Sequence, residues 1–141
     1  MMDLYREELL EHWRNPQNFG EMKGADLVVE QVNPLCGDEV TFYFKLSKKQ
    51  KAKSKKIIED VRFSGSGCAI SIASASILSE KIKGKKISTL SKITGEDVLK
   101  LVGGSVSPAR LKCAFLALEA VRRIVTNDEG LKTKAKIGVG R

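Results

Sequence analysis

The chain has 141 residues and a formal charge of +8, with 25 Lys and Arg against 17 Asp and Glu. Its length and its hydrophobic content of 42% allow one ordinary core, so disulfides or a structural metal are not needed merely for folding. Three cysteines are too few, and odd in number, for a secreted disulfide scaffold, and a single histidine excludes a multi-histidine zinc site. We therefore expect one cytoplasmic domain over residues 1–131, followed by a flexible tail over residues 132–141.

The sequence predicts no targeting or membrane segment. Residues 1–8 include acidic side chains and lack the basic head and apolar stretch of a signal peptide. The longest charge-free stretch, Phe63 to Ser79, is too short and too rich in Ser and Gly to span a bilayer. We expect no membrane contact.

The first predicted element is a short amphipathic helix over residues 3–13, which Asn15 and Pro16 end. The only histidine of the chain, His12, lies on this helix. We expect His12 to be a surface or packing residue rather than a catalytic one.

Three strands are predicted after this helix. We expect them over residues 27–32, 39–46 and 57–63. In the second strand apolar and polar side chains alternate, which is typical of a strand with one buried face. In the third strand Ile57, Val61 and Phe63 share a face that Glu59 interrupts.

The segment between the second and third strands is rich in lysine. Seven lysines lie between Lys45 and Lys56, and such a run repels itself and cannot be buried. We expect a solvated hairpin tip there. Because the run lacks interleaved aromatic residues, nucleic-acid binding is only a minor alternative function.

Three helices are predicted in the second half of the chain, each with its own start or stop signal. They are Ala69 to Lys83 before Gly84, Thr94 to Leu101, and a long helix with Ser107 as its N-cap and Pro108 at its first position that ends before Gly130. The expected fold class is α+β: a three-stranded antiparallel sheet with several helices packed against it, in a single compact domain.

The predicted topology brings distant cysteines together. In an antiparallel meander, the turn between the first two strands lies at the same end of the sheet as the exit of the third strand. Cys36 lies in that turn, Asp38 follows it, and Cys68 comes just after that exit. Cys113, expected in the second turn of the long helix, completes the group if the start of this helix packs toward the same end.

Three thiolates and one carboxylate supply the four ligands of a tetrahedral zinc ion or of a small iron-sulfur cluster. Cys68 opens a helix, whose N-terminal amides favour a thiolate, and Lys112 next to Cys113 is an auxiliary group with the same effect. The oxygen of Asp38 is a mismatched ligand for a soft metal or for cluster iron, which suggests that the metal or cluster is bound weakly and can leave. The alternative is that the cysteines are small buried hydrophobes and Asp38 is a turn residue.

Four segments of the chain match motifs of a known family. They are Asn15-Pro-Gln-Asn-Phe-Gly20, Asn33-Pro-Leu-Cys-Gly-Asp38, Gly65-Ser-Gly-Cys-Ala-Ile-Ser71 with Ala73-Ser-Ala-Ser76, and Lys112-Cys113-Ala114. In these segments the sequence resembles the U-type iron-sulfur cluster scaffold family, which includes IscU, SufU and the N-terminal domain of NifU. The likeness covers nearly the whole chain.

The resemblance implies a protein that builds a labile [2Fe-2S] cluster from iron and from sulfur of a cysteine desulfurase, and hands it to apoproteins, without being an enzyme in the ordinary sense. It implies Cys36, Cys68 and Cys113 as ligands, and Asp38 as fourth ligand or as the residue that promotes release. We favour Cys113, beside Lys112 and presented outward, as the acceptor of persulfide sulfur, with Cys36 as the rival. A monomer or a cluster-bridged dimer fits this activity.

Two departures from the family pattern leave two functions open. Lys112 stands where the IscU branch has histidine, and Ser105 to Ala109 replaces its chaperone-recognised segment, so we do not expect the dedicated chaperone as a partner. The SufU branch has lysine at that place, but its insertion between the second and third cysteines is absent here. A cluster scaffold is therefore our first hypothesis, and a zinc-bound sulfur acceptor that stimulates a desulfurase is the alternative.

Overall fold

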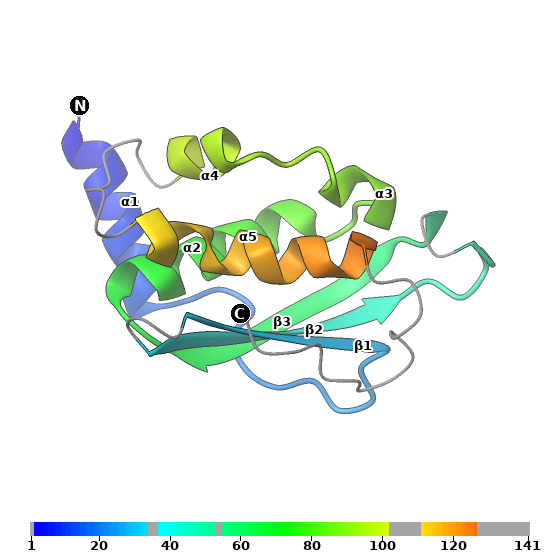
Figure 1. Ribbon diagram of the computed structural model, residues 1–141. Helices are drawn as coiled ribbons and strands as arrows, with labels where there is room; N and C mark the ends of the chain where they lie inside the picture. Colours follow the sequence, from blue (N-terminus) through cyan, green and yellow to red (C-terminus); the bar gives the residue numbers. More distant parts are fainter. Residues whose placement is uncertain (1, 34–36, 53–54, 102–110, 127–141) are drawn as a thin grey trace.

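The computed structural model describes residues 2–33, 37–52, 55–101 and 111–126. The elements in chain order are α1 (Met2–Arg14), β1 (Leu27–Asn33), β2 (Asp38–Leu46), β3 (Ile58–Ser66), α2 (Ala69–Ile82), α3 (Ile87–Leu90), α4 (Gly95–Leu101) and α5 (Leu111–Thr126). The strands form one antiparallel sheet in the order β1-β2-β3. The helices lie on one face of this sheet, which confirms the predicted α+β fold class (Figure 1).

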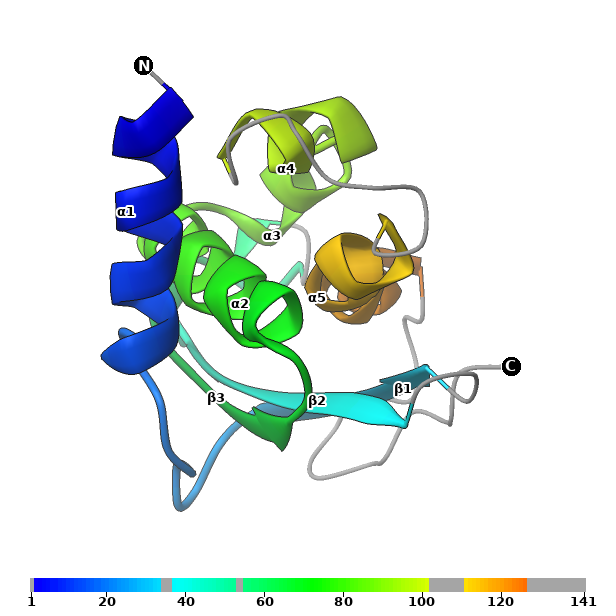
Figure 2. The same ribbon diagram turned by 90° about the vertical axis from the view of Figure 1, so that its left-hand side faces the viewer.

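Helix α2 lies at the centre of the helical layer. It packs between α1 on one side and α5 on the other, and the sheet lies beneath it (Figure 2). This position buries α2 on nearly all sides, and its buried residues include Ser71, Ser74, Ser76 and Ser79. The hydroxyls of Ser71, Ser76 and Ser79 hydrogen-bond with neighbouring segments, whereas that of Ser74 has no partner among the described residues.

The core between the sheet and the helices follows from the alternation predicted for β2. Its residues are buried at every second position, and the inward face carries Phe42 and Phe44. The ring of Phe42 stacks on Phe44 and on Phe63 of β3, with centroid separations of 5.9 and 5.8 Å. These contacts fix the register of β2 and β3 at the middle of the sheet.

The start of β3 differs from the prediction. Ile58, not Ile57, is fully buried. The pairing register shifts so that Lys45 lies opposite Asp60 while Leu46 lies opposite Ile58, which leaves Glu59 as an extra residue. This bulge brings Ile58 and Val61 to the same face despite their odd spacing, so the inward position predicted for Ile57 is wrong.

The helix signals are correct where the structure describes them. Helix α2 ends at Ile82, and Gly84 follows with a φ of 87°. Thr94 caps α4: the Asp97 amide donates to Thr94 Oγ1 at 3.1 Å, and the Thr94 amide donates to the Asp97 carboxylate at 2.9 Å. The four-residue α3 was not predicted. The predicted cap of the long helix at Ser107 and Pro108, and the tail over residues 132–141, lie outside the described residues.

The described part of the chain has no helix that is long and apolar enough to cross a membrane.

Candidate metal centre

The sheet topology places two of the predicted ligands at one end of the molecule. β2 begins at Asp38, and its neighbour β3 ends at Ser66, with Glu39 opposite Ser66 in the pairing register. Cys68 follows two residues after β3 and is the N-cap of α2, as the sequence predicted. The meander therefore brings the first carboxylate of β2 beside the thiol at the start of α2.

Cys113 completes this group from α5. The described part of this helix starts at Leu111, two residues before Cys113. Residues 102–110 lie outside the described residues, so the predicted place of Cys113 in the second turn stays a prediction. One ligand atom each of Asp38, Cys68 and Cys113 lies within 4.8 Å of the other two. The structure thus brings together three of the four residues that the sequence proposed as ligands. The fourth, Cys36, lies outside the described residues.

Ser71 is a member of this site that the sequence reasoning did not identify as such. Its hydroxyl donates a short hydrogen bond of 2.6 Å to Asp38 Oδ2 and lies 3.7 Å from the Cys68 sulfur. It also lies 3.5 Å from the backbone carbonyl oxygen of Cys113, which is a weaker contact. Ser71 comes one helical turn after Cys68, and that spacing is the signal that could have revealed it. The hydrogen bond from Ser71 fixes the orientation of the Asp38 carboxylate.

Two glycines make room for this arrangement. A Cβ atom on Gly65, whose φ is 154°, would lie 2.2 Å from the backbone oxygen of Glu39. A Cβ atom on Gly67 would lie 2.8 Å from Cγ of Asp38. Both approaches are too close for a side chain, so Gly65 allows β3 to lie close against the backbone of β2, and Gly67 allows the chain to pass directly beside the Asp38 carboxylate.

The two thiols have opposite electrostatic environments. Partial burial raises the pKa of Cys68, but hydrogen bonds from the Ser71 amide, the Cys113 thiol, the Ser71 hydroxyl and the Ile70 amide outweigh this effect and lower the pKa below its ordinary value. Burial raises the pKa of Cys113 to about 12, and the neighbouring Cys68 and Asp38 add to this effect. At neutral pH, Cys68 is therefore the better thiolate and Cys113 is held as a thiol.

The expected outward presentation of Cys113 is wrong in this conformation. Only 5% of the residue is exposed, because α5 turns this position toward α2 and β2. Lys112 is exposed, and its charge acts on Glu119. Burial raises the pKa of the Glu119 carboxyl group, and the charge of Lys112 partly offsets that rise. The roles of Cys113 as persulfide acceptor and of Lys112 as auxiliary group stay predictions.

The donor set fits a metal ion that accepts sulfur and oxygen ligands. Two thiolates and a carboxylate are three ligands of a tetrahedral zinc site, and a fourth is needed to complete it. In such a site neighbouring ligand atoms lie roughly 3.5 Å apart. The ligand atoms of Asp38, Cys68 and Cys113 lie within 4.8 Å of one another, so small side-chain movements would bring them to the distances of a metal site. The same sulfur atoms suit cluster iron, for which an oxygen ligand is the weaker partner.

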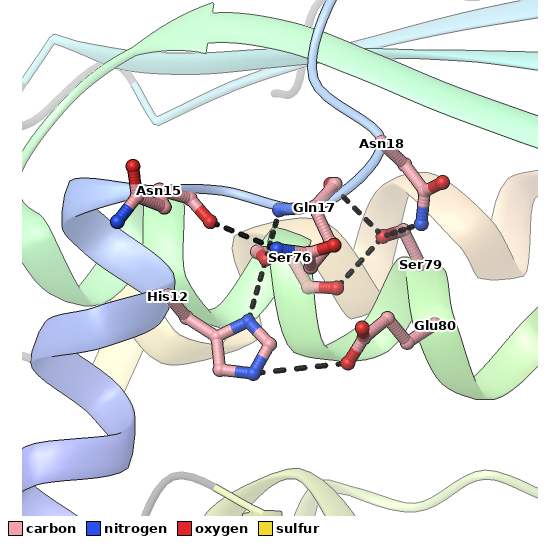
Figure 3. Close-up of polar contacts among 7 residues, drawn as sticks. All are labelled: His12, Asn15, Gln17, Asn18, Ser76, Ser79 and Glu80. Atoms are coloured by element: carbon pink, nitrogen blue, oxygen red, sulfur yellow. Dashed lines mark hydrogen bonds and ion pairs between the residues drawn. The ribbon is translucent and has the colours of Figure 1, made fainter.

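His12 lies away from this centre, at the contact between α1 and α2 (Figure 3). Its Nδ1 is 2.6 Å from the Ser76 hydroxyl oxygen, and its Nε2 is 3.7 Å from a carboxylate oxygen of Glu80. The amide of Gln17 also donates to the Ser76 hydroxyl, at 2.8 Å. His12 therefore packs against α2 in a network of polar contacts, as the packing alternative predicted.

Comparisons with known proteins agree with this geometry. Residues 4–135 match the model of the NifU-like N terminal domain. The chain is 38% identical to the zinc-dependent sulfurtransferase SufU of Bacillus subtilis (strain 168), an alignment that covers 90% of this chain and 92% of SufU. It is 36% identical to the iron-sulfur cluster assembly scaffold protein IscU 1 of Archaeoglobus fulgidus, over 88% of this chain and 76% of that protein.

A solved structure has the same fold. The N-terminal part of a nitrogen-fixing NifU-like protein from Brucella abortus superposes with a TM-score of 0.66 over 89% of this chain and 96% of that one. The two sequences are 22% identical, so this likeness concerns the arrangement of the sheet and helices alone.

Proposed function

This chain belongs to the U-type iron-sulfur scaffold family, because residues 4–135 match the NifU-like N terminal domain, and we propose that it assembles a labile [2Fe-2S] cluster and transfers it to apoproteins. The observation that carries the proposal is the meeting of Asp38, Cys68 and Cys113, whose ligand atoms lie within 4.8 Å of one another. Cys36 is the proposed fourth ligand. The cluster is the cargo of the protein, its sulfur comes from a cysteine desulfurase, and a reducing cytoplasm keeps its thiols free of disulfides.

Within this proposal the residues have distinct tasks. Cys68 is the better suited of the two described thiols to bind iron as a thiolate, because hydrogen bonds at the start of α2 lower its pKa. Asp38, held by the hydroxyl of Ser71, supplies the weaker oxygen ligand at which a bound cluster opens for release. Cys113 becomes a ligand when binding of the metal displaces its proton.

Sulfur enters by exchange between a persulfide and a thiol. A thiolate of this chain attacks the outer sulfur of the desulfurase persulfide, a new sulfur–sulfur bond forms on this chain, and the desulfurase cysteine leaves as a thiolate. The exchange itself needs no oxidant or reductant. Conversion of the transferred sulfur to cluster sulfide takes two electrons per sulfur, which ferrous iron or excess thiol supplies. We assign the attack to Cys113, with Cys36 as the rival. Because Cys113 is buried and its pKa is raised to about 12, this assignment requires α5 or its neighbours to move when the desulfurase binds, so that the thiol is accessible and can lose its proton.

The alternative is a zinc-bound sulfur acceptor that stimulates a desulfurase and never carries a cluster. It is supported by the 38% identity to the zinc-dependent sulfurtransferase of Bacillus subtilis and by Lys112 before the third cysteine. Both functions use the same ligands, so geometry alone does not separate them.

Anaerobic loading separates the two functions. The protein is incubated with ferrous iron, cysteine and a desulfurase, followed by visible absorption, and then analysed for iron, acid-labile sulfide and zinc. A scaffold becomes coloured and contains iron and sulfide in equal amounts. A colourless protein that retains its zinc while it accelerates the desulfurase would contradict the scaffold and support the alternative.

The substitution Asp38→Ala sharpens this test. We expect the loaded cluster to be lost more slowly from the variant than from the parent protein, because the harder and more exchangeable ligand is gone. The decay of visible absorption in the presence of a chelator measures this rate. Faster loss from Asp38→Ala would show instead that the carboxylate holds the cluster.

A further inference from the structure

The lysine-rich segment before β3 meets a second lysine-rich segment in the folded chain. The carbonyl oxygen of Lys56 accepts a hydrogen bond of 3.0 Å from the Ile87 amide, and that of Lys85 accepts one of 2.9 Å from the Ile58 amide. These bonds join the β2–β3 hairpin to the link between α2 and α3. We call the lysines gathered there the lysine pole: Lys45, Lys48, Lys49, Lys51, Lys55 and Lys56 of the hairpin, with Lys83, Lys85 and Lys86 of the link.

The lysine pole carries a large excess of positive charge on the surface. All its members are exposed except Lys56, which is half-buried and donates to the Ser47 carbonyl oxygen at 3.0 Å. Two carboxylates, Glu59 and Asp60, lie at the adjoining start of β3, and Asp60 is 3.2 Å from Lys83. A third carboxylate, Asp26, accepts from the Leu46 amide at 2.7 Å. Among the described residues, nine lysines against three carboxylates leave an excess of positive charge that attracts an anionic partner.

An apolar hollow opens directly beside the lysine pole. It has a volume of about 470 Å³, which is within the usual range of binding pockets. Its walls include Leu78, Ile82, Leu90 and Ile93 of α2, α3 and the link to α4. The charged residues that line its rim are Lys81, Lys85 and Lys100, with Asp97 as the one carboxylate among them, so cations outnumber it three to one. Lys85 thus belongs both to the lysine pole and to the rim, so one ligand can contact both.

We propose that this surface docks an acidic, amphipathic segment of a partner protein. An aliphatic or aromatic side chain of the segment enters the hollow, and its carboxylates lie against the rim lysines and the lysine pole. The combination of a concave apolar surface with surrounding cations is complementary to such a segment.

Two other anionic partners fit less well. Nucleic-acid binding proteins commonly combine arginines and stacking aromatic residues with their lysines, and the lysine pole has neither, while an apolar hollow offers nothing to a phosphate backbone. A protein that binds an anionic membrane inserts protruding apolar side chains between the lipids. Here the apolar side chains line a depression instead.

The proposed docking surface and the metal centre lie at opposite ends of the molecule. β3 runs from Ile58 beside the lysine pole to Ser66 beside Cys68, a length of about 26 Å for an extended strand. In Figure 1 the β2–β3 hairpin and α3 lie at one end of the sheet, and the start of α2 lies at the other. A partner held at the lysine pole therefore leaves the thiols free for sulfur or metal exchange.

The test uses a fluorescein-labelled acidic peptide in which leucine recurs every third or fourth residue among glutamates. Its binding to the full chain is measured by fluorescence anisotropy. A control peptide has serine in place of each leucine. We expect the leucine peptide to bind more tightly, and Lys85→Glu to weaken it by roughly fivefold or more. The matched control Arg14→Glu reverses an exposed charge on α1 and should leave the affinity unchanged.

A second variant tests the hollow itself. Thr89→Trp fills the hollow without changing charge, and should reduce binding of the leucine peptide to the level of the serine peptide. Equal effects of Lys85→Glu and Arg14→Glu would overturn the proposal, and so would equal binding of the two peptides by the parent chain. Tighter binding of duplex DNA or of phosphatidylglycerol vesicles than of the leucine peptide, abolished by Lys85→Glu, would assign the surface to another polyanion and also overturn it.

Discussion

Helix α2 has two buried polar regions, and they differ in what their polar atoms do. In its first turn Ser71 holds the Asp38 carboxylate, which lies beside two thiols. In its second half Ser76 and Ser79 bind His12, the Gln17 amide and Asn18, so that donors and acceptors are matched (Figure 3). The second region can stabilise the contact with α1 by itself. The first region gathers sulfur and oxygen atoms that are poor hydrogen-bond partners for one another.

The type and burial of a serine do not show what it does. Ser71 and Ser76 lie in the same helix and are 4% and 0% exposed. What they do depends on their partners. Ser71 binds a carboxylate that lies beside two sulfur atoms, whereas Ser76 binds α1 and the loop that follows it. We expect substitutions in the first region to change metal or cluster loading, and substitutions in the second to change the free energy of unfolding.

The largest effect is expected at the thiols of the first region. Cys68→Ser and Cys113→Ser should each abolish stable loading, because a hydroxyl is a poor ligand for zinc or cluster iron. Iron, sulfide and zinc per chain after anaerobic loading measure the effect, and circular dichroism confirms that the variants are folded. Full loading of either variant would remove that residue from the ligand set. The same substitution at Cys36 tests the ligand that lies outside the described residues.

The next largest effect is expected for Ser76→Ala in the second region. The substitution leaves the Gln17 amide and Nδ1 of His12 without this buried hydroxyl, which should lower the free energy of unfolding by about 1–3 kcal/mol. Urea denaturation measures the loss. Loading per folded chain should be unchanged, and a variant that folds normally but no longer loads would break the distinction between the two regions.

The two regions also differ in how far the sequence could reveal them. The alternation in β2 and the positions of Asp38 and Cys68 beside a meander turn are local patterns, and they predicted this end of the site. The contact of Ser71 with Asp38 was missed because the two residues are distant in sequence, although the spacing of one helical turn from Cys68 could have placed Ser71 near the site. The burial of Cys113 was missed because the rotation of α5 against α2 depends on packing that the periodicity of a single helix does not specify.

The error in β3 has a similar physical origin. Strand prediction assumes a period of two, and the bulge at Glu59 breaks that period between Ile58 and Val61. The pairing of the lysine-rich hairpin with the α2–α3 link is also a tertiary contact, so the sequence indicated a charged hairpin tip but not the second group of lysines beside it.

A smaller effect is expected for Ser71→Ala. Without the hydrogen bond at 2.6 Å, the carboxylate of Asp38 is no longer fixed toward the thiols, and we expect zinc affinity to fall by about tenfold. Competition with a chelator of known affinity measures this change, and Ser76→Ala is the matched control because it removes a serine hydroxyl from the same helix. Unchanged zinc affinity in Ser71→Ala would show that Asp38 keeps its orientation without this contact.

The smallest effect is expected for Ser74→Ala, between the two regions. Ser74 is 3% exposed, and its hydroxyl has no hydrogen-bond partner among the described residues. Removing a buried hydroxyl that lacks a partner should leave loading unchanged and change the free energy of unfolding by less than about 1 kcal/mol, toward higher stability. A loss as large as that of Ser76→Ala in urea denaturation would mean that Ser74 has a partner, such as a buried water molecule, and that the matched polar network along α2 extends closer to the metal centre.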